Sequence, residues 1–353
     1  MQWIRSSENK RRTAATNSKM VMNMEKENKN EKFLSVEDME VIYTSGGDVV
    51  HAVNRVSFDL HRGETLGLVG ETGAGKTTIA KTILRILPDP PAKVLSGRVF
   101  LNGEDLYEKS EEEMLKIRGD KIAMIFQDPM TALNPLMTVG DQILEVLLLH
   151  NDYSREKAVM KAKEMLEMVG IPGERYAEYP HQFSGGMKQR VVIAMALACN
   201  PELVLADEPT TALDVTIQAQ VLNLIQNLKE KYETAMILIT HDLGVVAQTC
   251  DKVAVIYAGE IVEAGPIEAI FDHATHPYTI GLFGSLPDIT KDGPRLHPIE
   301  GLPPDPTVIP QGCSFYPRCQ FACKECGEKK IPLTELTPGH YCRCCVKTKE
   351  ATR

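Results

Sequence analysis

The pattern of polar and apolar residues first predicts short strands near the N-terminal end. Residues 33–36 and 39–43 are β-prone, and a Gly46-Gly47 turn leads to residues 53–60, where polar and apolar side chains alternate. These segments favour a small antiparallel sheet. A further strand is predicted over residues 97–102, because turn residues follow it.

Four later segments are apolar along most of their length and end in polar residues or glycine, which is typical of buried strands. Apolar residues at helical spacing follow these segments and also fill an insertion between Pro135 and Pro172. The alternation predicts an α/β fold with a helical insertion. The four segments are residues 65–69, 122–126, 203–208 and 235–240.

The two ends of the chain depart from this pattern. Residues 1–32 are polar and have no sustained periodicity, which predicts a disordered leader. A proline-rich linker over residues 294–310 leads to a cysteine cluster. We therefore expect a main domain over residues 33–265, with its helical part at about 128–182, and an extension over residues 266–353.

Size and charge limit the possible classes of protein. A length of 353 residues is enough for one large domain with an appendage. The formal net charge of −9 gives no support for a nucleic-acid partner. Because no apolar run approaches the ~20 residues that a membrane-spanning helix needs, we expect any membrane role to be peripheral.

A glycine-rich segment between a predicted strand and a predicted helix carries the first candidate chemistry. Its glycines allow a tight turn with inward-pointing N–H groups, and the following helix adds the positive end of its dipole. Lys76 can contact β- and γ-phosphates, and the Thr77 hydroxyl can bind Mg²⁺. An accidental glycine-rich turn is the alternative. The candidate phosphate-binding residues are Gly70, Glu71, Thr72, Gly73, Ala74, Gly75, Lys76, Thr77 and Thr78.

Polar residues at the ends of three predicted strands indicate the same chemistry. Asp207 and Glu208 end one strand, where one carboxylate can bind Mg²⁺ and the other can orient an attacking water. His241 and Gln127 follow two other strands. Nucleotides bind at such strand ends in open α/β sheets. A strand-ending Asp that caps a turn and an incidental His are the alternatives.

Three further segments are weaker signals when each is taken alone. Tyr43 ends a strand and can stack on adenine, or it is simply a half-buried strand aromatic. Ser184 is a good helix N-cap, and Gly185 and Gly186 would let the helix start approach an anion. Asp214 precedes another predicted helix.

Together these motifs resemble the nucleotide-binding subunit of an ATP-binding cassette (ABC) transporter across residues 33–345. The resemblance implies a P-loop ATPase core with an antiparallel β subdomain, a helical signature subdomain and a small Cys-rich extension. Residues 70–78 match Walker A, residues 203–207 Walker B, Gln127 the Q-loop, residues 184–187 the signature, residues 212–214 the D-loop and His241 the switch histidine.

The resemblance also implies a role for each site residue. The Walker A residues would hold the phosphates of ATP, while Thr77 and Asp207 would hold Mg²⁺. Gln127 would contact the ion and the attacking water and report to the membrane subunits. Glu208 would polarise that water, and His241 would contact the γ-phosphate. The subunit would therefore be an ATPase.

Finer features are similar to the dipeptide and oligopeptide importer subgroup: residues 127–130, Met187 in the signature, and residues 276–279. The subgroup implies a second homologous ATPase subunit, two membrane permeases, and an extracytoplasmic peptide-binding protein. It also implies a position at the cytoplasmic face of the cell membrane. Ser184, Gly185 and Gly186 would complete the site on ATP bound by the partner, and Met187 favours a heterodimer.

Seven of the nine cysteines fall between Cys313 and Cys345, whereas Cys199 and Cys250 lie in apolar helical context and are expected to be buried. Disulfides are disfavoured in an ATP-rich, reducing compartment, so a thiolate metal site is the better interpretation, with zinc or an iron–sulfur cluster as its occupant. The importer subgroup has a similar tail, in which some members bind a [4Fe-4S] cluster. That resemblance assigns Cys313, Cys319, Cys326 and Cys344 to the cluster and leaves Cys323, Cys342 and Cys345 unassigned. Zinc and a tail without metal are the alternatives.

Other classes remain open from the sequence. A soluble ABC ATPase of DNA repair or translation usually has two cassettes or a long coiled-coil insertion, and this chain has neither. A metal-sensing protein with an inactive nucleotide site conflicts with the intact Glu208 and His241. Within transport, import of nickel or of a sugar is the remaining alternative, because the substrate is chosen by other subunits.

Overall fold

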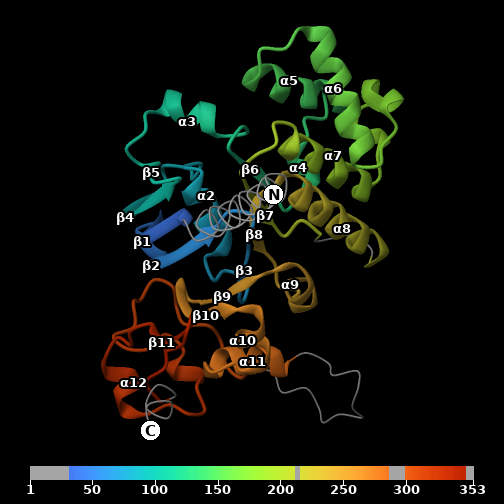
Figure 1. Ribbon diagram of the computed structural model, residues 1–353. Helices are drawn as coiled ribbons and strands as arrows, with labels where there is room; N and C mark the ends of the chain where they lie inside the picture. The colour runs from blue at the N-terminus through green and yellow to red at the C-terminus, as the bar shows by residue number, and fades with distance from the viewer. Residues whose placement is uncertain (1–31, 211–214, 286–298, 347–353) are drawn as a thin grey trace, which may run out of the picture.

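A computed structural model describes residues 32–210, 215–285 and 299–346, which form two sheets with helices around them (Figure 1). The predicted leader lies almost entirely outside these residues. Within the described part of the chain, no helix is long and apolar enough to cross a membrane.

An antiparallel sheet of four strands, in the order β2-β1-β4-β5, confirms the first prediction. The two strands expected at 33–36 and 39–43 are one continuous strand. A register shift between Val36 and Met39, where Asp38 has a φ of 45°, interrupts the alternation on which the prediction relied. The strands are β1 (Lys32–Ser45), β2 (Asp48–His61), β4 (Ala92–Leu101) and β5 (Glu104–Asp105).

The main sheet has eight strands in the order β11-β12-β10-β9-β3-β8-β7-β6. Strands β3, β8, β7 and β6 run parallel, and all their residues are buried, as their apolar sequences predict. Their carboxyl ends therefore meet at one edge of the sheet. The strands are β3 (Thr65–Val69), β6 (Ile122–Ile125), β7 (Leu203–Asp207), β8 (Ala235–Ile239), β9 (Lys252–Tyr257), β10 (Glu260–Pro266), β11 (Thr334–Thr337) and β12 (His340–Cys342).

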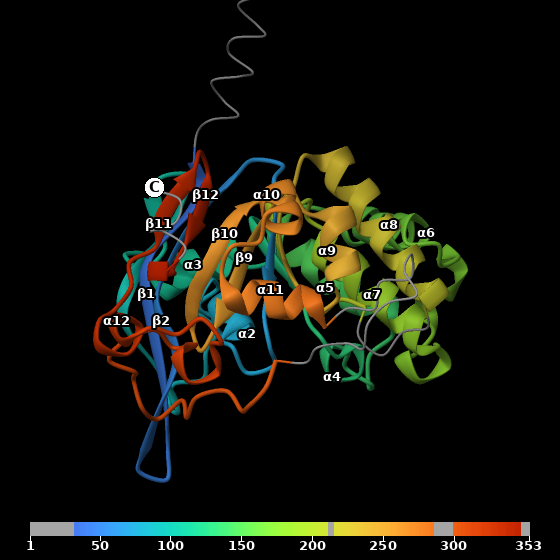
Figure 2. The same cartoon turned by 90° about the horizontal axis from the view of Figure 1, so that it is seen from below.

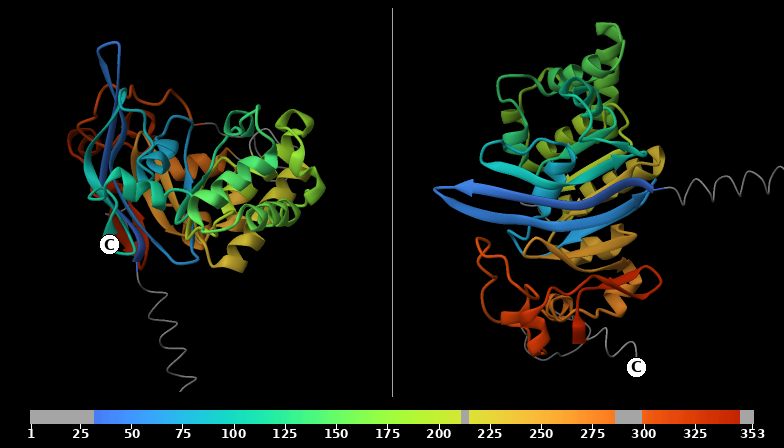
Figure 3. Two further views of the ribbon diagram at one scale, coloured as in Figure 1. Left: turned by 90° about the horizontal axis from the view of Figure 1, so that it is seen from above. Right: turned by 90° about the vertical axis from the view of Figure 1, so that its left-hand side faces the viewer.

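The expected boundary between the main domain and the extension falls within β10. This strand pairs with β9 on one side and with β12 on the other, where Glu263 lies opposite Cys342. Figure 2 shows the strands of the extension beside β10. In the right-hand view of Figure 3, β1 and β2 lie between the helical part above and the extension below. The extension therefore continues the main sheet. The division at residue 265 stays a prediction.

The predicted helical insertion forms the part of the molecule that projects at the upper right of Figure 1. Its two longer helices begin at the N-caps Thr138 and Ser154, whose hydroxyls accept backbone hydrogen bonds from Asp141 and Lys157. The α-helices are α2 (Lys76–Ile83), α3 (Glu111–Ile117), α4 (Pro129–Ala132), α5 (Val139–His150), α6 (Arg155–Met168), α7 (Gly185–Leu197), α8 (Val215–Tyr232), α9 (Leu243–Thr249), α10 (Ile267–Asp272), α11 (Pro277–Gly284) and α12 (Lys324–Glu328).

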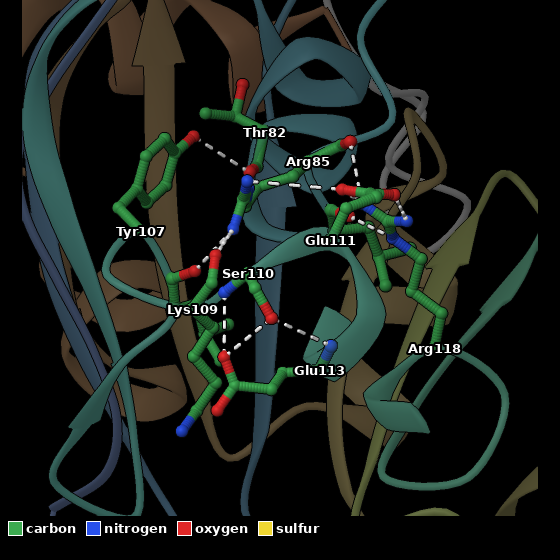
Figure 4. A network of polar contacts seen from close by, with 10 residues as sticks. Thr82, Arg85, Tyr107, Lys109, Ser110, Glu111, Glu113 and Arg118 are labelled. Carbon is green, nitrogen blue, oxygen red and sulfur yellow. Dashed lines mark hydrogen bonds and ion pairs between the residues drawn. The ribbon is translucent and has the colours of Figure 1, made fainter. Parts of the chain in front are cut away.

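Helix α2 ends at Ile83, although apolar residues at helical spacing continue to Leu87, because Arg85 has a left-handed φ of 53°. Its end is fixed by the network in Figure 4. Arg118 Nη2 donates to the Arg85 carbonyl at 3.0 Å, and Arg85 Nη1 donates to the Lys109 carbonyl at 2.7 Å. The Tyr107 hydroxyl donates to the Thr82 carbonyl at 3.1 Å. The helix that follows the glycine-rich segment is thus tied to residues on both sides of α3.

Candidate nucleotide-binding site

The glycine-rich residues 70–78, called the P-loop below, run from the end of β3 into the first turn of α2, between a strand and a helix as predicted. Gly70 has a φ of +154°, and a Cβ there would lie 2.1 Å from the Ile256 carbonyl oxygen. Gly75 has a φ of +102°, and a Cβ there would lie 2.3 Å from the Ala52 carbonyl oxygen. Only glycine fits these two positions, so close backbone packing fixes the loop from outside.

Lys76 is the first residue of α2 and is only 7% exposed. Its Nζ donates to the carbonyl oxygens of Gly70 at 2.8 Å and Glu71 at 2.9 Å, so the amine lies within the turn of the loop. Burial lowers the pKa of Lys76, and the nearby carboxylates of Glu208 and Asp207 oppose this effect. A cation held inside the loop is what a phosphate-binding site needs.

Asp207 ends β7 and lies beside the P-loop. The Thr77 hydroxyl donates to Asp207 Oδ1 at 3.0 Å, so two of the three residues predicted to contact Mg²⁺ are adjacent, the third being Gln127. Burial raises the pKa of Asp207, while the bond from Thr77 lowers it. A carboxylate and a hydroxyl beside a phosphate-binding loop fit Mg²⁺, which prefers oxygen ligands and keeps contacts with substrate phosphates.

Glu208 lies between two other predicted site residues. Gln127 Nε2 donates to Glu208 Oε2 at 2.7 Å, and His241 Nδ1 lies 3.3 Å from Glu208 Oε1. Glu208 was expected to end the strand, but it has a left-handed φ of 46° and follows β7. The Glu208 amide donates to the Ile239 carbonyl at 2.8 Å, which fixes this turn to β8. The three predicted residues thus come together at the ends of β6, β7 and β8.

Of the remaining predicted residues, the structure describes Tyr43 and Ser184 but not Asp214. Ser184 caps α7 as predicted, since its hydroxyl accepts from the Met187 amide at 3.4 Å. The Tyr43 hydroxyl lies 3.3 Å from Thr78 Oγ1, so the ring stands beside the P-loop. Asp214 lies outside the described residues, so its predicted role stays a prediction.

Comparisons with known proteins agree with a nucleotide-binding site at this place. Residues 53–211 match the family model described as ABC transporter, and residues 262–326 match the one described as oligopeptide/dipeptide transporter, C-terminal region. The chain is 50% identical over 323 residues to the dipeptide transport ATP-binding protein DppD of Bacillus subtilis, covering 91% of this chain and 96% of that protein. This chain belongs to the ABC transporter family.

Other relatives agree with this membership. The ABC subunit is 46% identical over 319 residues to the oligopeptide transport ATP-binding protein OppD of Escherichia coli, covering 90% of this chain and 94% of that protein. The dimeric structure of the ATP-binding cassette MJ0796 bound to ADP and Pi is 28% identical, with a TM-score of 0.60. That match covers 66% of this chain and 98% of the cassette. About a third of this chain therefore lies outside the match with that cassette.

The Cys-rich extension of this ABC subunit brings several thiols together. Cys323, Cys326 and Cys345 have sulfur atoms within 4.8 Å of one another, at separations of 3.1–3.8 Å. The set expected from the resemblance shares only Cys326 with this triad. All four expected residues line the same small cavity, together with Cys345. Cysteine sulfur atoms are suitable ligands for zinc or an iron–sulfur cluster, so the chemistry of the cysteines that line this cavity fits either occupant.

The two cysteines outside the extension differ. Cys250 is buried as predicted, and burial raises its pKa to about 12. Cys199 is only half-buried and faces Asn151 Nδ2 at 3.6 Å. Neither belongs to the thiol cavity.

Two residues of the extension contact the P-loop and were not identified from the sequence as site residues. The Tyr278 hydroxyl accepts a hydrogen bond from the Glu71 amide at 3.0 Å, and Arg318 contacts the Glu71 carboxylate. Tyr278 belongs to the segment 276–279 that signalled only the importer subgroup. Arg318 carried no signal apart from its place next to Cys319.

Proposed function

We propose that this ABC subunit hydrolyses ATP to power the import of dipeptides or oligopeptides through a membrane transporter. The observation that carries the proposal is Glu208, which lies between Gln127 and His241 beside the P-loop. Support for the peptide class comes from the family match of residues 262–326 and from relatives that are named dipeptide and oligopeptide transport proteins. The place of action would be the cytoplasmic face of the cell membrane.

In the proposed reaction, Lys76 and the P-loop amides bind the phosphates of ATP. Thr77 and Asp207 would hold Mg²⁺, and the ion would supply positive charge that neutralises the phosphates. Glu208 orients the attacking water, with Gln127 and His241 fixing its carboxylate from two sides. His241 would contact the γ-phosphate. It follows β8, the strand next to β7, and so lies at the same edge of the sheet as Asp207 and Glu208. This arrangement supplies positioning and electrostatic stabilisation, the main contributions to catalysis of phosphoryl transfer.

The functional unit we propose contains a second homologous ATPase subunit and two permeases, with an extracytoplasmic peptide-binding protein that delivers the substrate. Ser184, Gly185 and Gly186 at the start of α7 would contact the ATP bound by the partner ATPase. Helix N-termini bind anions, and Gly185 leaves open space where a side chain would stand. Met187 in the signature favours a partner of different sequence over a second copy.

The test is reconstitution of the complex in lipid vesicles. The chain should co-purify with two permeases, and a peptide-loaded binding protein should stimulate its ATPase and drive uptake of labelled dipeptide. Stimulation only by a binding protein loaded with nickel or sugar would assign it to that solute. Hydrolysis without any permease association would favour a soluble ABC ATPase, the alternative of a different class.

We further propose that Cys313, Cys319, Cys326 and Cys344 hold a [4Fe-4S] cluster, with zinc as the alternative. All four line one cavity, and the cluster would join the segment 313–326 to the strand β12 that precedes Cys344. Such a group would act as a structural staple for a small extension, because metal binding contributes directly to folding.

Metal analysis of the purified chain tests this assignment. Iron and sulfide with absorbance near ~400 nm would support the cluster, and zinc without colour would support the alternative. Cys326→Ser should remove the metal, while Cys199→Ser should not. Serine variants of Cys344 and Cys345 separate the proposed set from the triad: loss of metal with Cys345→Ser alone would contradict the proposed ligands.

A further inference from the structure

A partly buried ion pair joins the extension to the P-loop. Arg318 ends the 3₁₀ turn Tyr316–Arg318, and its Nη1 lies 3.1 Å from both carboxylate oxygens of Glu71. The Arg318 side chain is 6% exposed and that of Glu71 28%. Removing either partner would leave the other charge incompletely paired in a largely desolvated place, which is costly.

The rest of the Arg318 guanidinium is fixed by the extension itself. Its Nε donates to the Glu300 carbonyl at 3.1 Å, and Nη2 donates to the Ile299 carbonyl at 3.3 Å. Nη1 also lies 3.3 Å from the Tyr257 hydroxyl at the end of β9. These contacts with residues outside the P-loop give the Arg318 side chain one defined orientation.

Tyr278 holds the same loop residue from a second direction. Its hydroxyl accepts from the Glu71 amide at 3.0 Å, and its ring centroid lies 4.6 Å from that of Tyr257 and 5.5 Å from that of Phe315. Phe315 belongs to the same short segment as Arg318 and is 3% exposed. Residues 313–319 thus support Glu71 directly through Arg318 and indirectly through the aromatic cluster.

Glu71 in turn contacts Lys76, the lysine assigned to the phosphates. The Glu71 carbonyl accepts from Lys76 Nζ at 2.9 Å and from the Ala74 amide at 3.2 Å. The carboxylate, the amide and the carbonyl of Glu71 are all engaged, so a rotation of this residue would move the Lys76 amine. The contact chain is Arg318 to Glu71 to Lys76.

We propose that Arg318 is a positioning residue for the nucleotide site, which sets the affinity for ATP by fixing Glu71 and, through it, the Lys76 amine. The inference rests on the assignment of the P-loop to ATP phosphates under the proposed function. It adds that the extension is part of the nucleotide site's support and not only an appendage. The sequence neighbours of Arg318, Cys319 and Cys313, line the thiol cavity, so this support and the thiol site share one segment.

Equilibrium binding of MgATP to the full-length chain tests the proposal, with thermal unfolding measured on the same samples. Arg318→Ala should weaken ATP binding about tenfold, and Arg318→Lys should recover part of the loss, because it keeps the charge but not the planar contacts. In the assembled transporter, Arg318→Ala should raise KM for ATP more than it lowers kcat, because the defect is in binding.

The matched control is Arg343→Ala. Arg343 is another partly buried arginine of the extension, and it donates to the Ile261 carbonyl at 2.9 Å and the Ile331 carbonyl at 3.0 Å. An equal loss of ATP affinity in both variants would show a general defect of the extension and overturn the proposal. Unchanged affinity in a folded Arg318→Ala chain would also overturn it. Failure of the parent chain to bind ATP would instead contradict the P-loop assignment.

Discussion

Gln127 donates a 2.7 Å hydrogen bond to Glu208, and this contact links the ends of two adjacent strands. Gln127 lies just beyond β6 and Glu208 just beyond β7, strands that pair in parallel. The other Glu208 oxygen faces His241, just beyond β8. Because each neighbour contacts a different oxygen, movement of either strand end would reorient the carboxylate.

Glu208→Gln should lower steady-state ATP hydrolysis by the assembled complex by about 10²-fold or more, since loss of a general base typically has that effect. The amide has nearly the same shape, so ATP binding should be retained. Phosphate release at saturating ATP measures the first effect and equilibrium binding the second. Glu202→Gln, at the opposite end of β7 and paired with Arg62, is the control and should hydrolyse ATP like the parent. Unchanged hydrolysis by Glu208→Gln would mean that the assigned role is wrong.

His241→Ala should also slow hydrolysis, because it removes the group 3.3 Å from Glu208 Oε1. The His241 side chain is 66% exposed, so the loss should leave the melting temperature nearly unchanged. The two measurements are phosphate release by the complex and thermal unfolding of the chain. His273→Ala replaces an exposed histidine outside the site and serves as control. If His241→Ala hydrolysed ATP at the parent rate, the proposed role of His241 in hydrolysis would be contradicted.

Much of this site could be predicted because its residues follow apolar strands. Gln127, Asp207 and His241 stand where a parallel sheet brings strand ends together, and this placement follows from local pattern alone. The support of Glu71 could not be predicted in this way. Glu71 and Arg318 are 247 residues apart, and their contact depends on how the extension folds back onto the loop.

The thiol site shows a similar limit of sequence reasoning. The clustering of seven cysteines in a chain expected in a reducing compartment indicated a metal site, but which sulfur atoms approach one another depends on the path of the chain between Cys326 and Cys345. That path includes β11 and β12, which were not predicted and which extend the main sheet. Cys323 and Cys345 were left unassigned from the sequence, although their sulfur atoms lie 3.8 Å apart.

Thr77→Val should raise the Mg²⁺ concentration needed for half-maximal hydrolysis, because it removes one of two adjacent oxygen ligands while keeping the side-chain size. Asp207 would also lose its 3.0 Å hydrogen bond from Thr77. Thr77→Ser keeps the hydroxyl and should behave nearly like the parent. Titration of the ATPase with Mg²⁺ at fixed ATP compares the three proteins. Equal Mg²⁺ dependence of the valine variant and the parent would exclude Thr77 as a ligand.

The two signature glycines should respond differently to alanine. A Cβ at Gly186 would lie 2.6 Å from Cγ2 of Ile217 in α8, a stiff β-branched side chain, whereas a Cβ at Gly185 would meet nothing within 4 Å. In the isolated chain, Gly186→Ala should therefore lower the free energy of unfolding by roughly 1–3 kcal/mol, as overpacking does.

Gly185→Ala should leave that free energy unchanged or slightly raised, because alanine favours helix over glycine. Chemical denaturation measures both values. In the assembled complex, both variants should lower ATPase activity, Gly185→Ala because its methyl group occupies the open space that we assign to the partner's ATP. Full activity of Gly185→Ala in the complex would argue that the start of α7 does not approach nucleotide.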